Sequence, residues 1–273
     1  MHYAARGSAL LVSVSFLCGC EVLWAPYIGT FETPSAVADL GAVADLSAIA
    51  DLSAVPLCDP TDPTLILCLT FDGQLVDGTS NKIAITGGPV DGYVPGAIGQ
   101  AALFGVKTPT VSLGDSAAWN VSEYTFEAWV RPDEKPTGTL NRFGLMDRQA
   151  GYSMFLYGNV DPGSVALRCA FNDVTTQALQ IPIGRFSHIA CTFKSGEQIL
   201  YLNGKQEFSD TKSVQTPPPA LLPHYLGSNV QSPPGDVEAY TLVGALDEIR
   251  LFSQVRTAAQ IRASYERGSA ALR

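Results

Sequence analysis

Short runs of β-branched and aromatic residues recur from residue 57 to the end of the chain, and turn-forming residues separate them. Runs of this length and spacing are typical of a two-sheet sandwich or jelly roll, and 25 glycines and 18 prolines supply the turns. The sequence therefore predicts an all-β fold, an antiparallel jelly-roll sandwich. The predicted strands are Leu65–Phe71, Ala101–Phe104, Thr110–Leu113, Tyr124–Val130, Tyr152–Tyr157, Ser164–Phe171, Leu179–Pro182, Phe186–Lys194, Gln198–Leu202 and Leu242–Phe252.

Local signals fix a turn and one helix. Asn203-Gly204 predicts a type I′ hairpin turn, because both central residues of that turn need positive φ. Thr257 and Gln260 form a capping-box pattern ahead of a short C-terminal helix. Ile261 and Tyr265, four residues apart, are expected to pack on the sandwich, and Gly268 is expected to end the helix.

Residues 1–20 have the pattern of an export signal. A weakly basic start precedes the apolar stretch Ala9–Leu17, which is too short to span a bilayer. Leu17-Cys18-Gly19-Cys20 resembles the lipobox of bacterial lipoproteins, which implies a lipid on Cys20 and a lipid-anchored protein of the bacterial cell envelope. The alternative is an ordinary secretory signal cleaved near Gly19. In both cases the mature chain enters an oxidising space.

Residues 21–56 read as a low-complexity linker. They hold five acidic residues and no basic ones, and a six-residue repeat runs from Ala36 to Ser53. A period of six places the repeated leucines on three faces of a helix, so no apolar stripe forms. The folded domain is therefore expected to be 57–273. The formal net charge of −9 argues against a nucleic-acid partner.

Several segments, in this order, resemble the laminin G-like domain of the concanavalin A-like lectin/glucanase fold. The resemblance covers about Leu65 to Arg267, and Phe186 departs from it, because the family favours tryptophan there. It implies a jelly roll that binds carbohydrate, protein or matrix. The segments are Leu69–Gly73, Asp77–Asn81, Val94–Ala101, Tyr124–Pro132, Phe186–Phe193, Leu200–Gly204 and Gly244–Phe252.

No catalytic pattern is found. Glycosidases of the resembled fold cluster carboxylates as Glu-x-Asp-x-x-Glu on one strand, and this spacing is absent. Asp247 and Glu248 are adjacent, so on a regular strand they would point to opposite faces. His188 is expected to be a core or edge imidazole bonded to backbone rather than a general base, and His224, among prolines, to be solvated.

The leading hypothesis is a non-catalytic surface module with a glycan or a surface protein as partner, requiring no cofactor. A degenerate or unrecognised carbohydrate-active enzyme is the alternative. A purely structural envelope protein without a ligand is a third interpretation.

Four cysteines remain beyond the signal, which allows three connectivities. Cys58 and Cys68 are close in sequence. Cys169 and Cys191 fall in two strands expected to be near each other, and they resemble a cysteine pattern of laminin G-like relatives. We therefore predict the bonds Cys58–Cys68 and Cys169–Cys191. The second bond requires that Val174–Pro182 does not pair between those two strands, and a buried free thiol at Cys191 is its alternative.

The resemblance also implies a structural calcium ion at the rim of the sandwich. Asp72, after the first strand, and Asp247, in a late strand, match positions where the family places acids. First and last strands are neighbours in such sandwiches, so both carboxylates could reach one ion. Calcium takes six to eight oxygen ligands, and these residues supply only two side chains. The alternative is that both acids accept hydrogen bonds from backbone N–H groups in tight turns.

Overall fold

The computed structural model describes residues 57–87, 90–105, 111–137, 139–148, 151–171, 174–175, 178–211, 224–228 and 240–272. The predicted signal, the lipidation site Cys20 and the linker lie outside the described residues. The described residues belong to one unit, which spans Ile49–Arg273. None of the helices in this part of the chain is long and apolar enough to cross a bilayer.

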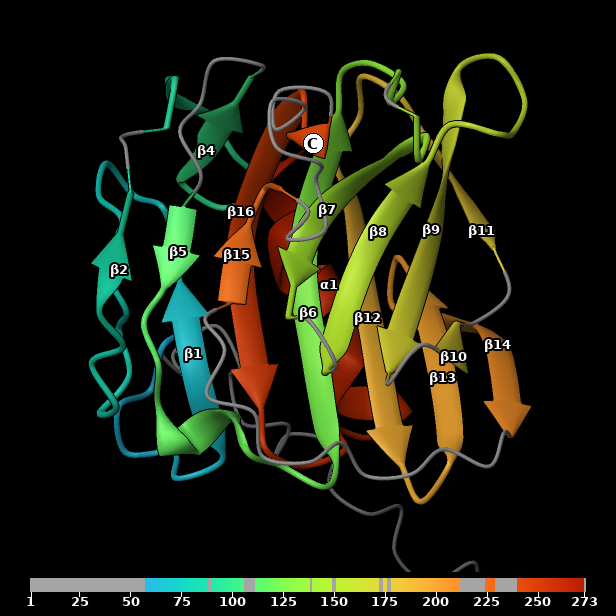
Figure 1. Cartoon of the computed structure of the whole chain (residues 1–273). Coiled ribbons are helices and arrows are strands. Elements are labelled where there is room, and N and C mark those ends of the chain that lie inside the picture. The colour runs from blue at the N-terminus through green and yellow to red at the C-terminus, as the bar shows by residue number, and fades with distance from the viewer. Residues whose placement is uncertain are drawn as a thin grey trace, which may run out of the picture. The chain divides into compact units, whose positions relative to one another are not determined.

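Two antiparallel sheets face each other, which confirms the predicted jelly-roll sandwich (Figure 1). Sheet A has the order β14-β13-β12-β6-β16-β4-β3, with β1 also paired to β16, and sheet B has the order β10-β9-β8-β7-β15-β5-β2, with β11 paired to β9. The strands of sheet A are β1 (Leu65–Leu69), β3 (Gly92–Pro95), β4 (Gln100–Phe104), β6 (Tyr124–Pro132), β12 (Ser187–Lys194), β13 (Glu197–Leu202), β14 (Lys205–Thr211) and β16 (Gly244–Phe252). The strands of sheet B are β2 (Ile85–Thr86), β5 (Val111–Leu113), β7 (Arg142–Asp147), β8 (Tyr152–Tyr157), β9 (Ser164–Phe171), β10 (Val174–Thr175), β11 (Leu179–Pro182) and β15 (His224–Leu226).

Strand β6 shows how the sequence makes both a core face and an outer face. Phe126, Ala128 and Val130 point into the apolar core between the sheets. The alternate residues Glu127 and Trp129 point to the opposite face and are also buried, at 0% and 1% exposure. The outer face of sheet A must therefore be covered.

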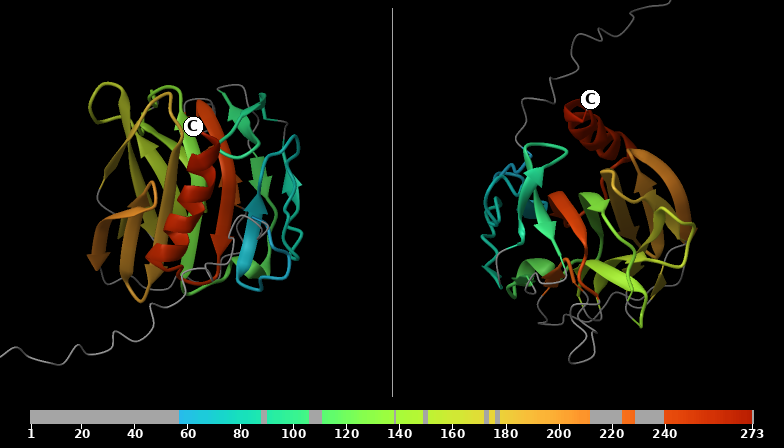
Figure 2. Two further views of the ribbon diagram at one scale, coloured as in Figure 1. Left: turned by 180° about the vertical axis from the view of Figure 1, so that it is seen from behind. Right: turned by 90° about the horizontal axis from the view of Figure 1, so that it is seen from above.

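Helix α1 (Ala258–Ala271) provides that cover by packing on the outer face of sheet A (Figure 2). The predicted capping box is present: Thr257 N donates to Gln260 Oε1 at 2.8 Å, and Gln260 N donates to Thr257 Oγ1 at 3.3 Å. Ile261 packs with residues of β12 and β13, and Tyr265 stacks on Trp129 with ring centroids 5.7 Å apart. Helix and sheet are thus joined by the residues that the periodicity identified.

Gly268 does not end the helix, so that prediction was wrong. The helix continues through it to Ala271. A Cβ at position 268 would lie 2.5 Å from the indole ring of Trp129. The glycine therefore allows close approach of helix and sheet instead of terminating the helix.

The predicted hairpin at Asn203-Gly204 is confirmed, with φ values of 50° and 75° between β13 and β14. Six strands were not predicted: β2, β3, β7, β10, β14 and β15. They are short, polar or interrupted by glycine. β14, for example, has the sequence KQEFSDT and forms an edge of sheet A.

One of the two predicted disulfides is confirmed. Cys58 and Cys68 are bonded, with their Cα atoms 5.6 Å apart. The predicted Cys169–Cys191 bond is wrong: both are free, buried thiols. Cys169 lies on β9 of sheet B and Cys191 on β12 of sheet A, so the two strands are not neighbours within a sheet.

The two thiols meet across the core without a covalent bond. Packed sheets lie ~10 Å apart, whereas a disulfide needs Cα atoms within ~7 Å. Burial, followed by a hydrogen bond with Cys191, raises the pKa of the Cys169 thiol. These cysteines therefore act as small apolar core residues.

His224 is also buried, contrary to expectation. It lies on β15 at 0% exposure, with its ring 4.1 Å from that of Trp119 and 5.1 Å from that of Tyr152. Neither ring nitrogen has a hydrogen-bond partner, and burial, with a smaller effect of Arg148, lowers its pKa well below the ordinary value. The imidazole is therefore a neutral core ring.

Candidate binding site

The two acids predicted to bind calcium do converge, on the turn from Gly96 to Gln100. Oδ2 of Asp247 accepts hydrogen bonds from Ala97 N at 2.8 Å and Ile98 N at 3.0 Å. Oδ1 of Asp72 accepts one from Gln100 N at 2.9 Å. Strand β1 pairs with β16, as expected for first and last strands. Both carboxylates thus fasten one turn to the sheet.

A β-bulge brings a third acid to this place. The register of β16 against β6 shifts between Asp247 and Arg250, and Glu248 has a φ of 51°. The bulge breaks the alternation of side chains, so the expectation that Asp247 and Glu248 point to opposite faces was wrong. Both are buried, at 0% and 1% exposure, and the carboxylates influence each other.

Asp247 and Glu248 have too few hydrogen-bond partners to stabilise their ionised forms. Burial is the main cause that raises the pKa of Asp247 to about 7, against the hydrogen bonds from the turn. Burial and then the neighbouring Asp247 raise the pKa of Glu248 to about 8. Asp247 Oδ1 and both carboxyl oxygens of Glu248 have no hydrogen-bond partner.

Calcium binding by Asp72 and Asp247 stays a prediction. Within the described residues, no group of three or more histidine, cysteine, aspartate or glutamate side chains is arranged to hold a metal ion. The hydrogen bonds above give both acids the other role considered for them, as acceptors in a tight turn.

A different buried acid, Glu127, lies under helix α1 and is fully paired. Arg250 Nη2 donates to its Oε2 at 2.9 Å and Arg256 Nη1 to its Oε1 at 2.6 Å. Burial by itself would raise the pKa of Glu127, but Arg250, His188 and Arg256 outweigh burial and lower it to about 2. Glu127 is therefore a firm anchor for two arginines.

His188 packs beside this anchor. Its Nε2 lies 3.8 Å from Glu127 Oε2, beyond hydrogen-bond distance, and neither ring nitrogen has a hydrogen-bond partner. The ring is fully buried against the edge of Trp129, and burial is the largest cause that lowers its pKa. It is a core imidazole as expected, but it is not bonded to backbone.

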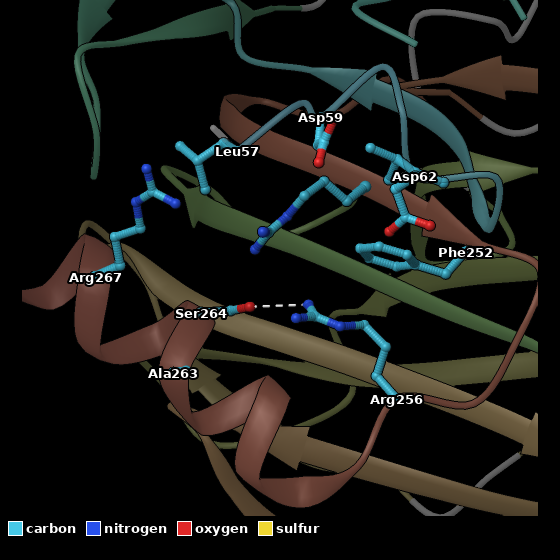
Figure 3. A pocket seen from close by; sticks show the side chains of 10 residues that line it. Leu57, Asp59, Asp62, Phe252, Arg256, Ala263, Ser264 and Arg267 are labelled. Carbon is cyan, nitrogen blue, oxygen red and sulfur yellow. Dashed lines mark hydrogen bonds between the residues drawn. The ribbon is translucent and has the colours of Figure 1, made fainter. Parts of the chain in front are cut away.

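These two arginines and Arg267 line a pocket of about 160 Å³ between helix α1 and strands β1 and β16, and Figure 3 shows Arg256 and Arg267 beside the helix. Arg250 comes from β16, Arg256 from the loop after it, and Arg267 from the helix. Arg256 Nη1 also donates to Ser264 Oγ at 2.9 Å, which ties the loop to the helix. Arg250 is 6% exposed and its Nε has no hydrogen-bond partner.

The opposite side of the pocket carries Asp59 and Asp62, which face the helix across the opening in Figure 3. Each begins an Asp-Pro-Thr triplet. Oδ1 of each carboxylate accepts from the backbone N of the threonine two residues on, at 2.8 Å in both cases, and from its hydroxyl. Within the described part of the chain, Oδ2 of each aspartate accepts no hydrogen bond.

The Cys58–Cys68 disulfide positions this aspartate segment, because it joins the residue before Asp59 to strand β1. Leu57, Leu65 and Phe252 add apolar surface to the pocket. The pocket thus combines hydrogen-bond acceptors, hydrogen-bond donors and apolar groups.

This pocket was not predicted from the sequence. Its one local signal is the repeated triplet from Asp59 to Thr64, which is characteristic of two consecutive Asx turns. The three arginines are spread over 18 residues of sequence, and only the packing of α1 against β16 brings them together.

The profile of the Laminin_G_3 family, described as the concanavalin A-like lectin/glucanases superfamily, matches residues 104–262. The chain belongs to this family, which confirms the resemblance read from its motifs. No curated protein sequence matches the chain.

Solved structures share the fold. Domain 4 of AbnA, a GH43 extracellular arabinanase from Geobacillus stearothermophilus, was solved with arabinotriose. It matches with a TM-score of 0.55 and 25% identity over 73% of this chain and 97% of that domain. The binding domain of Paraclostridial Mosquitocidal Protein 1 matches with a TM-score of 0.56 and 13% identity, covering 77% of this chain and 52% of that one.

A third similar structure is the binding domain of botulinum neurotoxin DC, solved with rat synaptotagmin II. It has a TM-score of 0.55 and 11% identity, and the match covers 75% of this chain and 52% of that one. The chain thus spans about half the length of the two toxin domains, and at these identities they show the fold alone.

Proposed function

We propose that this protein is a non-catalytic module that binds a glycan at the bacterial cell surface. The observation that carries the proposal is the match over 97% of an arabinanase domain that was solved with arabinotriose, a domain that binds sugar within a larger enzyme. The chemistry of the pocket lining also suits sugar binding. Sugar hydroxyls both donate and accept hydrogen bonds, so they need the two kinds of partner that its walls supply.

The geometry favours binding over hydrolysis. A glycosidase needs one carboxylic acid that stays protonated and a second carboxylate, both facing the substrate. The carboxyls with raised pKa, Asp247 and Glu248, are buried and do not line the pocket. In the pocket, hydrogen bonds from Thr61 lower the pKa of Asp59, which makes it a poor proton donor.

The experiment is a glycan array probed with the purified full-length chain, including arabinose oligomers, together with an assay for released sugar. We expect binding to a limited set of glycans and no release. Absence of binding to every glycan would overturn the glycan proposal and turn attention to a protein partner. Release of sugar would establish the enzyme alternative.

We further propose that a lipid on Cys20 tethers the module to the cell envelope, and that residues 21–56 act as the linker. The support is the lipobox pattern that ends at Cys20. Cys20→Ser should move the protein from the membrane fraction to the soluble fraction, whereas Cys18→Ser, the matched control, should not. Equal fractionation of Cys20→Ser and the unmodified protein would argue against lipidation there.

A further inference from the structure

The pocket under helix α1 also indicates what kind of sugar it would take. Its volume of about 160 Å³ is small beside the ~300–1,000 Å³ typical of sites for drug-sized ligands. A pocket of this size suits a small ligand, such as a single sugar ring, better than an extended oligosaccharide.

The charges around the pocket are balanced. Arg250, Arg256 and Arg267 contribute three positive charges, and Asp59, Asp62 and the underlying Glu127 contribute three negative ones. Glu248 also interacts with Arg250 and Arg267, but its pKa of about 8, raised mainly by burial, keeps it mostly neutral at pH 7. An additional carboxylate from a ligand would leave this arrangement with uncompensated charge. The balance therefore favours an uncharged ligand.

The aspartate side of the pocket provides unused hydrogen-bonding capacity. Oδ2 of Asp59 and of Asp62 accepts no hydrogen bond from the described residues and is available to hydroxyl donors. A sugar ring in the pocket would direct hydroxyl groups toward these carboxylates and would have the guanidinium groups of the lining arginines nearby as donors.

We propose that this pocket is the sugar site and that it holds one uncharged residue at the end of a glycan chain. The inference rests on the proposed glycan-binding function and specifies where and what the module binds. The rest of the chain would remain outside the pocket, so affinity should depend little on chain length.

The test uses the full-length chain and variants on the helix. Ala263 lines the pocket and Ala259, one turn earlier, is exposed. Ala263→Met extends a side chain into the pocket without removing a charge, and Ala259→Met is the matched control. Binding is measured by calorimetry with each sugar that the array identifies, as its methyl glycoside and as a trisaccharide, and thermal melting checks that both variants fold.

We expect Ala263→Met to weaken binding at least tenfold, Ala259→Met to leave it unchanged, and the glycoside and trisaccharide to bind within about threefold of each other. Methyl glucoside and methyl glucuronide differ only at C6, which is a CH2OH group in the first and a carboxylate in the second. A preference of the protein for uronates over their neutral counterparts would overturn the proposal of an uncharged ligand. If the protein binds a glycan on the array and Ala263→Met does not weaken that binding, the pocket is not the sugar site, although the glycan-binding function stands. Absence of all glycan binding would overturn both.

Discussion

Two groups of buried acids lie on the outer face of sheet A, and their pKa values are shifted in opposite directions. Glu127 of β6 pairs with two arginines and has a pKa of about 2. Asp247 and Glu248 of the adjacent strand β16 have pKa values of about 7 and 8. The register places them close: Glu127 is opposite Arg250, and Trp129 is opposite Asp247.

Burial is the largest single influence on all three acids and would raise the pKa of each, so burial does not explain the difference. Cation supply does. The side chains of Arg250 and Arg256 contact Glu127 directly, whereas Asp247 receives only backbone N–H groups and Glu248 receives no hydrogen bond. One acid is therefore a fixed charge that orders arginines at a pocket, and the other two hold protons near neutral pH.

The largest expected effect comes from removing the paired charge. Glu127→Gln removes the ion-pair partner of the buried Arg250 and of the mostly buried Arg256, and loss of one partner of a buried ion pair costs ~3–5 kcal/mol. We expect a lower free energy of unfolding by about this amount in urea titrations at pH 7.

The matched control is Glu123→Gln, because Glu123 pairs with Lys194 at the surface and such pairs contribute ~1 kcal/mol or less. The pKa of Glu127 is lowered, so its contribution is present above its unfolded pKa of about 4.5 and is lost as pH falls toward about 2. A variant as stable as the Glu123→Gln control would mean that the arginines do not depend on Glu127.

A smaller effect, with the opposite pH dependence, is expected at Glu248. Its pKa is raised from 4.5 to about 8, so the stability it contributes is fully present below pH 4.5 and is lost as pH rises through about 8. Glu248→Gln keeps the neutral shape at every pH. We expect equal stability at pH 4 and a variant more stable than the wild type by roughly 1–3 kcal/mol at pH 9, below the limit of ~1.36 kcal/mol per pKa unit because Asp247 titrates with it.

The measurement is the free energy of unfolding in urea at a series of pH values. Glu266→Gln serves as the control, since Glu266 is exposed on the helix and pairs with Arg262. Parallel pH profiles of Glu248→Gln and the wild type would show that Glu248 does not hold the proton, and the comparison with Glu127 would fail.

The sandwich was predictable because its signals are local. Alternation in β6, the Asn203-Gly204 turn and the Thr257 capping box each depend on neighbouring residues, and all three are confirmed. The predictions that failed depend on packing between distant segments. Gly268 is explained only by Trp129, which lies on another element, and the Cys169–Cys191 pair only by the assignment of β9 and β12 to different sheets.

The acids show the same limit at the candidate sites. The convergence of Asp72 and Asp247 followed from the adjacency of first and last strands, and it is observed at the Gly96–Gln100 turn. The bulge that turns Glu248 toward them has no signal in the sequence Asp247-Glu248. The pocket needs β1, β16 and α1 together, so no single segment predicts it.

The smallest expected effect is the change in Tm on adding calcium. The ion would replace protons at the poorly paired acids and would not affect the paired Glu127. A site present only in the folded state stabilises by RT ln(1 + [L]/Kd), ~1.4 kcal/mol at tenfold excess, or ~3–6 °C in Tm for a domain of this size. Asp247 must be deprotonated to bind the ion, and its pKa is about 7.

We therefore expect millimolar Ca²⁺ to raise Tm at pH 8.5 much more than at pH 6. EDTA should reverse the shift, and Asp247→Asn, which keeps an acceptor for the turn, should abolish it. If neither Ca²⁺ nor EDTA changes Tm at either pH, the only role of Asp72 and Asp247 is to hold the turn. The Glu127 region and the Asp247–Glu248 region would then differ in proton affinity alone.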